Sequence, residues 1–202
     1  TFTAAFRRWC IELETPIRSL RLNVRKVDVF YDAKPSFIYG DKNIGKALLK
    51  GHFQNSEYNL DVGAQGDPWT LAVPSEQFAR WLHSFYWLND LAVTKDKSAN
   101  IRARNLVDKW IETYGKWNFF AWSPDILSER VFSLLTVWST LLDGDSLSKK
   151  AQIRRISVVR QLKRLRIVYR QTSPGLHRFK AAAALAIGGA KIKEKTDAFL
   201  GL

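Results

Sequence analysis

The stretch P-S-E-Q-F-A-R-W-L-H-S-F-Y-W-L-N-D-L-A, residues 74–92, decides the fold class of this chain. Pro74 and Ser75 precede a helical pattern and Glu76 falls in its first turn, which are helix start signals. The apolar residues then recur at steps of three and four, the spacing that lines one face of an α-helix. They are Phe78, Trp81, Leu82, Phe85, Leu88 and Ala92. The sequence therefore predicts one helix whose apolar face is buried.

The opposite side of this predicted helix carries His83, Trp87 and Asp90. A lone amphipathic helix would carry only solvated groups there, so both faces are in use. We interpret the segment as an inner helix of a layered helical array, packed outward and lining a cavity inward. A ring flanked by hydrogen-bonding groups suits the stacking of a sugar; the alternative is that Trp87 is simply packed. Asn89, within the apolar stripe, is interpreted as a structural amide.

Composition indicates a folded protein. The chain has 202 residues, of which 46% are hydrophobic and 25% are charged, as in ordinary globular domains. No apolar run approaches the roughly 20 residues that span a bilayer. Cys10 is the one cysteine, which excludes an internal disulfide and a cysteine-based zinc cluster. His52, His83 and His177 do not have metal-ligand spacing, so we expect neither a metal nor a cofactor.

The positive charge is concentrated in one region. The formal net charge is +13, and residues 146–193 contain thirteen Lys or Arg and no Asp or Glu. Such a region attracts polyanions, whether nucleic acid, anionic lipid or acidic polysaccharide, and does not distinguish among them. The basic residues surround the predicted helix over 146–171 and do not form one ridge. This distribution is typical of a partly packed, solvated helix more than of one that reads a nucleic-acid groove.

Helical spacing and turn signals predict the other elements. An N-terminal helix is expected from Phe2 to Leu13 and an extended arm over 20–39. A small β-hairpin is expected across Asn55 and Ser56. Further helices are predicted over 44–49, 98–114, 124–142, 146–171 and 176–192.

These elements indicate the architecture. Helix hairpins joined by short turns, most with both faces used, predict a mainly α fold, an incomplete (α/α) toroid of antiparallel helix hairpins with a small β-hairpin near the N-terminus. We divide the chain into residues 1–73, an N-terminal helix, arm and hairpin packed on the toroid, and residues 74–202, the toroid helices.

Arg130 is the first candidate site residue, because it lies in the apolar stripe of the predicted helix over 124–142. An unpaired buried charge is expensive, so this arginine has to find a carboxylate or a cavity. One alternative is a pair with Asp125, Glu129 or Asp90. The other is a cavity in which Arg130 binds a substrate carboxylate through two hydrogen bonds.

Two further candidates come from the ends of predicted helices. His177 and Arg178 open the alanine-rich helix, where unpaired backbone N–H groups favour an anion. An imidazole there suits a general acid or base, the alternative being a structural role. Trp122 belongs to an aromatic loop that we interpret as a plug over one end of the bundle. Its other members are Trp117, Phe119 and Phe120.

Four segments together resemble a known family. They read W-L-H-S-F-Y-W-L-N-D-L (81–91), L-V-D-K-W-I (106–111), A-W-S-P-D-I-L-S-E-R-V (121–131) and G-L-H-R-F-K-A-A-A-A-L-A-I-G-G (175–189). Their order and spacing resemble the N-terminal helical part of the heparinase II/III-like polysaccharide lyases, over residues 44–192. The resemblance implies an incomplete toroid followed by a β-sandwich, expected beyond Leu202, in a bacterial protein of the periplasm or cytoplasm.

The same resemblance implies a function. It predicts a protein that binds an acidic, uronic-acid-containing polysaccharide and cleaves it by β-elimination, with His177 as a proton-transfer group. Leu176 stands where active lyases often have asparagine, so this chain alone is expected to be inactive. The implied substrate-binding residues are Arg130, Trp87, His83, Asp90, Trp122 and Arg178. The alternative is a non-catalytic basic helical module that docks nucleic acid or an anionic surface.

Overall fold

The computed structural model describes residues 24, 27, 30, 38–144 and 146–192. The predicted N-terminal helix and most of the predicted arm lie outside the described residues. Within them the chain is mainly helical, with one two-stranded antiparallel sheet. The prediction of a mainly α fold with a small hairpin is therefore confirmed.

The N-terminal elements form where the turn signals place them. Helix α2 spans Lys42–Lys50; the Asp41 side chain caps its first turn by accepting from two backbone N–H groups, and Gly51, at φ 94°, ends it. A left-handed residue is a common helix stop and suits glycine. Strands β1 (His52–Asn55) and β2 (Tyr58–Asp61) follow, with Phe53 opposite Leu60. The hairpin buries Phe53 against the helices.

The stretch over residues 74–92 is two helices, so the prediction of one continuous helix is wrong. Helix α3 spans Glu76–Ser84 and α4 spans Leu88–Thr94. Between them Phe85 takes a left-handed conformation, φ 59°, which ends α3. That conformation is unfavourable for a bulky residue, but Phe85 is fully buried. Its ring lies against those of Trp69, Trp87 and Trp110.

Side chains complete the interrupted end of α3. Its last carbonyls have no intrahelical partner, yet Ser84 Oγ donates to the carbonyl of Trp81 and Trp87 Nε1 donates to that of Leu82. Arg130 Nη1 donates to the carbonyl of His83 at 3.3 Å. The break therefore leaves none of these three buried carbonyls unpaired, and tertiary contacts hold it in place.

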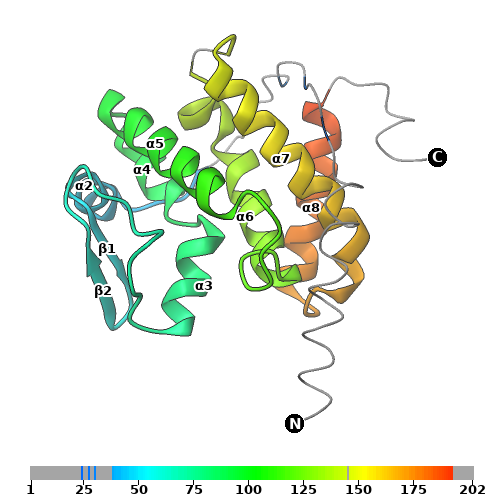
Figure 1. The fold of residues 1–202 in the computed structure, drawn as a ribbon, viewed down its shortest axis with the longest axis horizontal. Helices are drawn as coiled ribbons and strands as arrows, with labels where there is room; N and C mark the ends of the chain where they lie inside the picture. Colours follow the sequence, from blue (N-terminus) through cyan, green and yellow to red (C-terminus); the bar gives the residue numbers. More distant parts are fainter. Residues whose placement is uncertain (1–23, 25–26, 28–29, 31–37, 145, 193–202) are drawn as a thin grey trace.

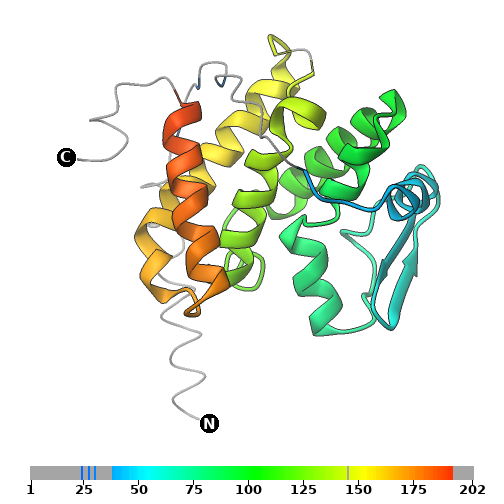
Figure 2. The ribbon, with the colours of Figure 1, turned by 180° about the vertical axis from the view of Figure 1, so that it is seen from behind.

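The remaining helices surround α6. Helix α5 spans Lys97–Tyr114, α6 Pro124–Thr136, a π-helical turn Trp138–Leu142, α7 Lys149–Val168, a 3₁₀ turn Tyr169–Gln171 and α8 Leu176–Lys191. Helix α6 contacts α3 and α4 on one side and α7 and α8 on the other (Figure 1). The view from behind shows α8 beside α6, far from the hairpin (Figure 2). Because it is enclosed in this way, α6 buries residues around its circumference.

Helices α2 and α4 approach so closely that only glycine fits at one contact. A Cβ built on Gly45 would overlap the backbone oxygen of Asp90 and lie 2.5 Å from Cγ2 of Thr94. Gly189, on α8, has open space where a Cβ would stand. A side chain is therefore excluded by close contact at Gly45 but not at Gly189.

We expect Gly45→Ala to lower the free energy of unfolding by about 1–3 kcal/mol, because the added methyl separates α2 from α4. Gly189→Ala is the matched control and should raise it by up to about 1 kcal/mol, since alanine favours a helix and meets nothing there. Urea unfolding followed by circular dichroism measures both changes. Two changes of the same sign would contradict the close contact.

Candidate functional site

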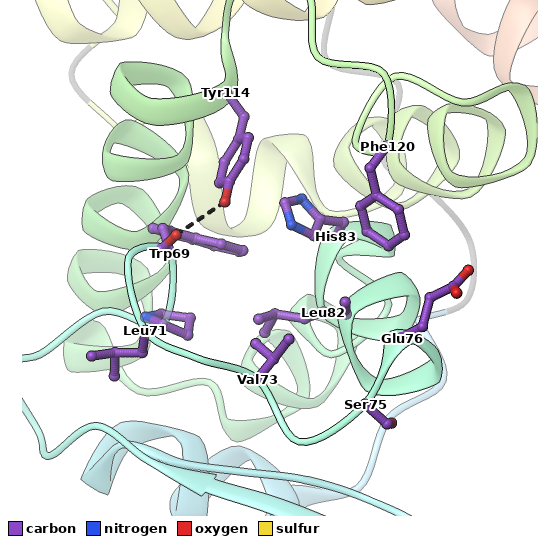
Figure 3. A pocket seen from close by; sticks show the side chains of 11 residues that line it. Trp69, Leu71, Val73, Ser75, Glu76, Leu82, His83, Tyr114 and Phe120 are labelled. Atoms are coloured by element: carbon purple, nitrogen blue, oxygen red, sulfur yellow. Dashed lines mark hydrogen bonds between the residues drawn. The ribbon is translucent and has the colours of Figure 1, made fainter. Parts of the chain in front are cut away.

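A pocket opens between α3, the loop that precedes it and the end of α5. Its volume is about 420 Å³ and its walls are mostly apolar and aromatic. Figure 3 shows the rings of Trp69, His83, Tyr114 and Phe120 around it, with Leu82 and Val73 below. The pocket lies over the buried centre of the fold, since Leu82 and His83 in its wall are buried.

The loop wall of the pocket is fixed by Trp69. This ring is buried, and its Nε1 donates to the carbonyl of Leu106 at 2.8 Å. Tyr114 Oη donates to the carbonyl of Trp69 at 3.1 Å, while the Trp69 N–H donates to Asp67. The first two bonds tie the loop to α5 through the side chain and the carbonyl of one residue, and the third is local to the loop. The pocket is therefore preformed.

His83 supplies a polar group to the pocket in one defined tautomer. Trp110 Nε1 lies 3.0 Å from His83 Nδ1. An indole N–H is a donor and never an acceptor, so Nδ1 accepts and the imidazole proton is on Nε2. The ring is held edge-on to Tyr114 and Phe120, with centroids 4.7 and 5.6 Å away. Within the described residues, no hydrogen bond engages Nε2–H, which is left to meet a ligand.

His83 stays neutral. Burial, and after it the positive charge of Arg130, lower the pKa of its imidazole to about 3. At neutral pH the ring is therefore a hydrogen-bond donor through Nε2 and a very weak base. It suits binding an acceptor atom better than removing a proton.

Arg130 is buried without a carboxylate, so neither predicted alternative is correct. Its Nε donates to Gln161 Oε1 at 2.7 Å and its Nη1 to the carbonyl of Ala121 at 2.6 Å, besides His83. The guanidinium lies 4.3 Å from the ring centroid of Trp110, a cation–π distance. Burial lowers the pKa of Arg130 to about 9, so it remains charged at pH 7.

The acids that were candidate partners of Arg130 have other roles. Asp125 accepts from the backbone N–H and the hydroxyl of Ser173. Asp90 accepts from the backbone N–H of Asp41 at 2.7 Å, and burial raises its pKa. The prediction that Asp90 faces a cleft beside His83 is therefore wrong, because the turn at Phe85 rotates α4 relative to α3.

Two tryptophans predicted to bind substrate belong to the core. Trp87 is completely buried, and its ring meets Phe53 edge-on. Trp122 is 2% exposed and donates to the carbonyl of Tyr114 at 2.8 Å. Neither has a free face, so the structure supports the alternative of packed rings.

His177 lies far from the pocket, at the start of α8. It is partly exposed, and its Nδ1 lies 3.4 Å from Oε1 of Glu129, which also binds Lys180 at 3.0 Å. Arg178 donates to the carbonyls of Thr172 and Arg170. The structure therefore places these two residues in the first turn of α8, and no contact joins them to His83 or Arg130 within the described residues.

Much of the basic region is structural. Arg154 binds both carboxylate oxygens of Asp108 at 2.9 Å in a nearly buried pair that joins α7 to α5. Arg155 is buried and donates to the carbonyl of Ser146. Arg164 lies 4.6 Å from the ring centroid of Trp117. The excess charge available to a partner is therefore smaller than the sequence count indicates.

The pocket residues that sequence reasoning missed are Trp69 and Tyr114. The sequence predicts a loop over residues 63–69, which ends at Trp69, and Tyr114 is the last residue of the predicted helix over 98–114. A tryptophan in the otherwise polar stretch G-A-Q-G-D-P-W is a signal of burial that could have marked that loop as part of the core.

The described residues contain neither a metal-binding cluster nor a membrane-spanning helix. No group of three His, Cys, Asp or Glu side chains there is placed to hold a metal ion. None of the helices in the described part has the length and apolarity needed to cross a bilayer.

Comparison with known proteins gives one named similarity. The chain is 40% identical over 97 residues to FtsZ-localized protein C of Caulobacter vibrioides (strain NA1000 / CB15N). The match covers 48% of this chain but 17% of that protein. No family model matches the sequence, and no solved structure matches it.

This similarity contradicts the predicted polysaccharide function. The named relative is an FtsZ-localized protein, not a polysaccharide-binding or polysaccharide-cleaving one. The prediction of uronate binding and β-elimination, drawn from helical motifs of modest specificity, is therefore wrong. The structure is consistent with this correction, because three of the residues predicted to bind substrate are buried. Trp87 and Trp122 are packed in the core, and Arg130 donates to backbone carbonyls.

The neutral state of His83 predicts a pH dependence of stability. The unfolded imidazole takes up a proton near its ordinary pKa of 6.5, whereas the folded one resists it down to about 3. Stability is therefore full above pH 6.5 and falls as the pH falls toward 3. We expect a loss of about 2 kcal/mol between pH 6.5 and 5, measured by urea unfolding.

His83→Gln is the informative variant, because its amide oxygen can accept from Trp110 but does not titrate. Its unfolding free energy should be nearly constant over that pH window. His52→Gln, at an exposed site, should keep the wild-type slope. Equal slopes for wild type and His83→Gln would show that His83 is not held neutral.

Proposed function

We propose that this chain is a helical binding module of a protein that localises with FtsZ. The observation that carries the proposal is its 40% identity over 97 residues to FtsZ-localized protein C. The match covers 17% of that relative, so localisation is the one property that we transfer to this chain.

The pocket around His83 supports a binding role. It is preformed, its walls are aromatic, and it offers a neutral N–H donor beside rings that exclude water. Sites of this kind bind an apolar group and orient it through a few polar contacts. We assign the pocket to a side chain of the protein that this module binds, with a carbonyl or other neutral acceptor on His83 Nε2–H.

We also infer that the helices form part of an incomplete (α/α) toroid. The support is that α6 is enclosed by neighbours on both sides while α7 runs back alongside it and α8 follows α7. Layered arrays of this kind use both faces of their inner helices. A structure of a longer form of the protein in which the next helix pair does not continue the curve would contradict this arrangement.

A fluorescent fusion of this chain, expressed in Caulobacter vibrioides with labelled FtsZ, tests the localisation. We expect the fusion to be enriched where FtsZ is, and purified FtsZ to retain the chain in a pull-down. Diffuse fluorescence and no retention would contradict the proposal.

Leu71→Glu tests the pocket. Leu71 lines the pocket and is 47% exposed, so a carboxylate there should block an apolar group without unfolding the chain. We expect enrichment to fall several-fold. Ile101→Glu, at a 55% exposed position on α5, is the matched control and should localise normally. If the Leu71→Glu fusion localises as well as the Ile101→Glu fusion, the role of the pocket is overturned, while the proposed localisation with FtsZ is unaffected.

A further inference from the structure

Helix α7 has an outer face that is only partly buried. Its buried side chains, Val158, Leu162 and Leu165 among them, face the core. About 180° away, other residues recur at alternating steps of four and three, the heptad spacing that forms a straight seam along a helix. We call this seam the α7 outer face. It consists of Lys149, Ile153, Ile156, Arg160, Lys163 and Ile167, with Arg170 just past the helix end.

The α7 outer face is both apolar and basic. Ile153 and Ile167 are 42% and 59% exposed, and Ile156 is half-buried. Isoleucines at such positions gain little on folding and remain available to a partner. Lys149, Arg160 and Lys163 alternate with them along the helix, so apolar and positive groups share the same surface.

Three of the four cations on this face are not used by the described fold; the fourth, Arg170, donates to Tyr169 Oη. Other basic residues of the region are engaged: Arg154 with Asp108 and Lys180 with Glu129. In the part of the chain that the structure describes, no ion pair involves Lys149, Arg160 or Lys163. The sequence places no acid anywhere between Ser146 and Lys193, so a neighbour on the same segment cannot neutralise them.

The combination narrows the class of partner. A second copy of the same face would set Lys and Arg against Lys and Arg, which like-charge repulsion disfavours. Duplex DNA would engage the cations but leave the isoleucines against phosphate and sugar. A helix that carries apolar residues at heptad spacing and acids beside them satisfies both sets of groups at once.

We propose that the α7 outer face docks an acidic amphipathic helix of a partner protein. Ile153, Ile156 and Ile167 pack against its apolar stripe, while Lys149, Arg160 and Lys163 pair with flanking carboxylates. A helix of 20 residues is about 30 Å long, so the contact falls in the small, transient class of interfaces. This proposal stands apart from the FtsZ localisation, because it rests on α7 alone.

A synthetic peptide tests the proposal against the whole 202-residue chain. The probe is a fluorescein-labelled peptide of about three heptads, with leucine at the two seam positions of each heptad and glutamate beside them. We expect saturable binding in the micromolar range by fluorescence anisotropy, weakened by added salt. Ile153→Glu with Ile167→Glu, and Arg160→Glu with Lys163→Glu, should each weaken it at least about tenfold.

Matched substitutions elsewhere control for folding and for total charge. Ile101→Glu removes an exposed isoleucine from α5, and Lys46→Glu reverses an exposed cation on α2; both should bind like wild type. All variants should keep the wild-type circular dichroism spectrum, since each substituted side chain is exposed or only partly buried.

Three results would overturn the proposal. The first is no binding of the peptide. The second is equal binding of a scrambled peptide of the same composition, which lacks the apolar stripe. The third is displacement of the peptide by duplex DNA or by phosphatidylglycerol vesicles, together with equal binding of that competitor to the wild type and to the Ile153→Glu, Ile167→Glu variant. That result would show that the face binds polyanions in general.

Discussion

The buried charge of Arg130 is the constraint on which the centre of this fold depends. A guanidinium without a carboxylate has to be satisfied by dipoles and by an aromatic face, or it would not be buried at all. The chain provides both: the carbonyls of His83 and Ala121, the amide of Gln161 and the ring of Trp110. These groups come from α3, the aromatic loop, α7 and α5. One side chain on α6 therefore fixes the positions of four other segments.

The same charge contributes to the character of the pocket. Burial keeps the imidazole of His83 neutral, the cation beneath it adds to this effect, and Trp110 can therefore donate to Nδ1. The indole in turn stands between the guanidinium and the pocket, and its face partly balances the charge. Arg130, Trp110 and His83 thus form one chain of interactions, which leads from the buried charge to the neutral N–H donor in the pocket wall.

The sequence predicts most of the helices of this fold but little of the site. Helix starts at Ser75, Ser123 and Gly175 follow local rules of capping and turns, which act within a few residues. The partners of Arg130 do not follow such local rules. Backbone carbonyl acceptors have no signature in a sequence, so the sequence predicts a carboxylate partner in their place. The motif resemblance was misleading for a related reason. Tryptophans spaced like ligand-binding residues are here packed in the core, and only burial distinguishes the two.

Phe85 was the residue at which local and tertiary preferences disagreed. Locally, the stretch from Glu76 to Thr94 favours an unbroken helix, and a left-handed phenylalanine opposes that preference. The break is supported by local contacts, such as Trp87 Nε1 with the carbonyl of Leu82, and by contacts that are distant in sequence, such as Arg130 with His83 and Trp69 with Phe85. It follows that the direction in which α4 leaves α3 depends on residues outside residues 74–92, because the loss of Arg130 or Trp69 would remove contacts that hold the turn.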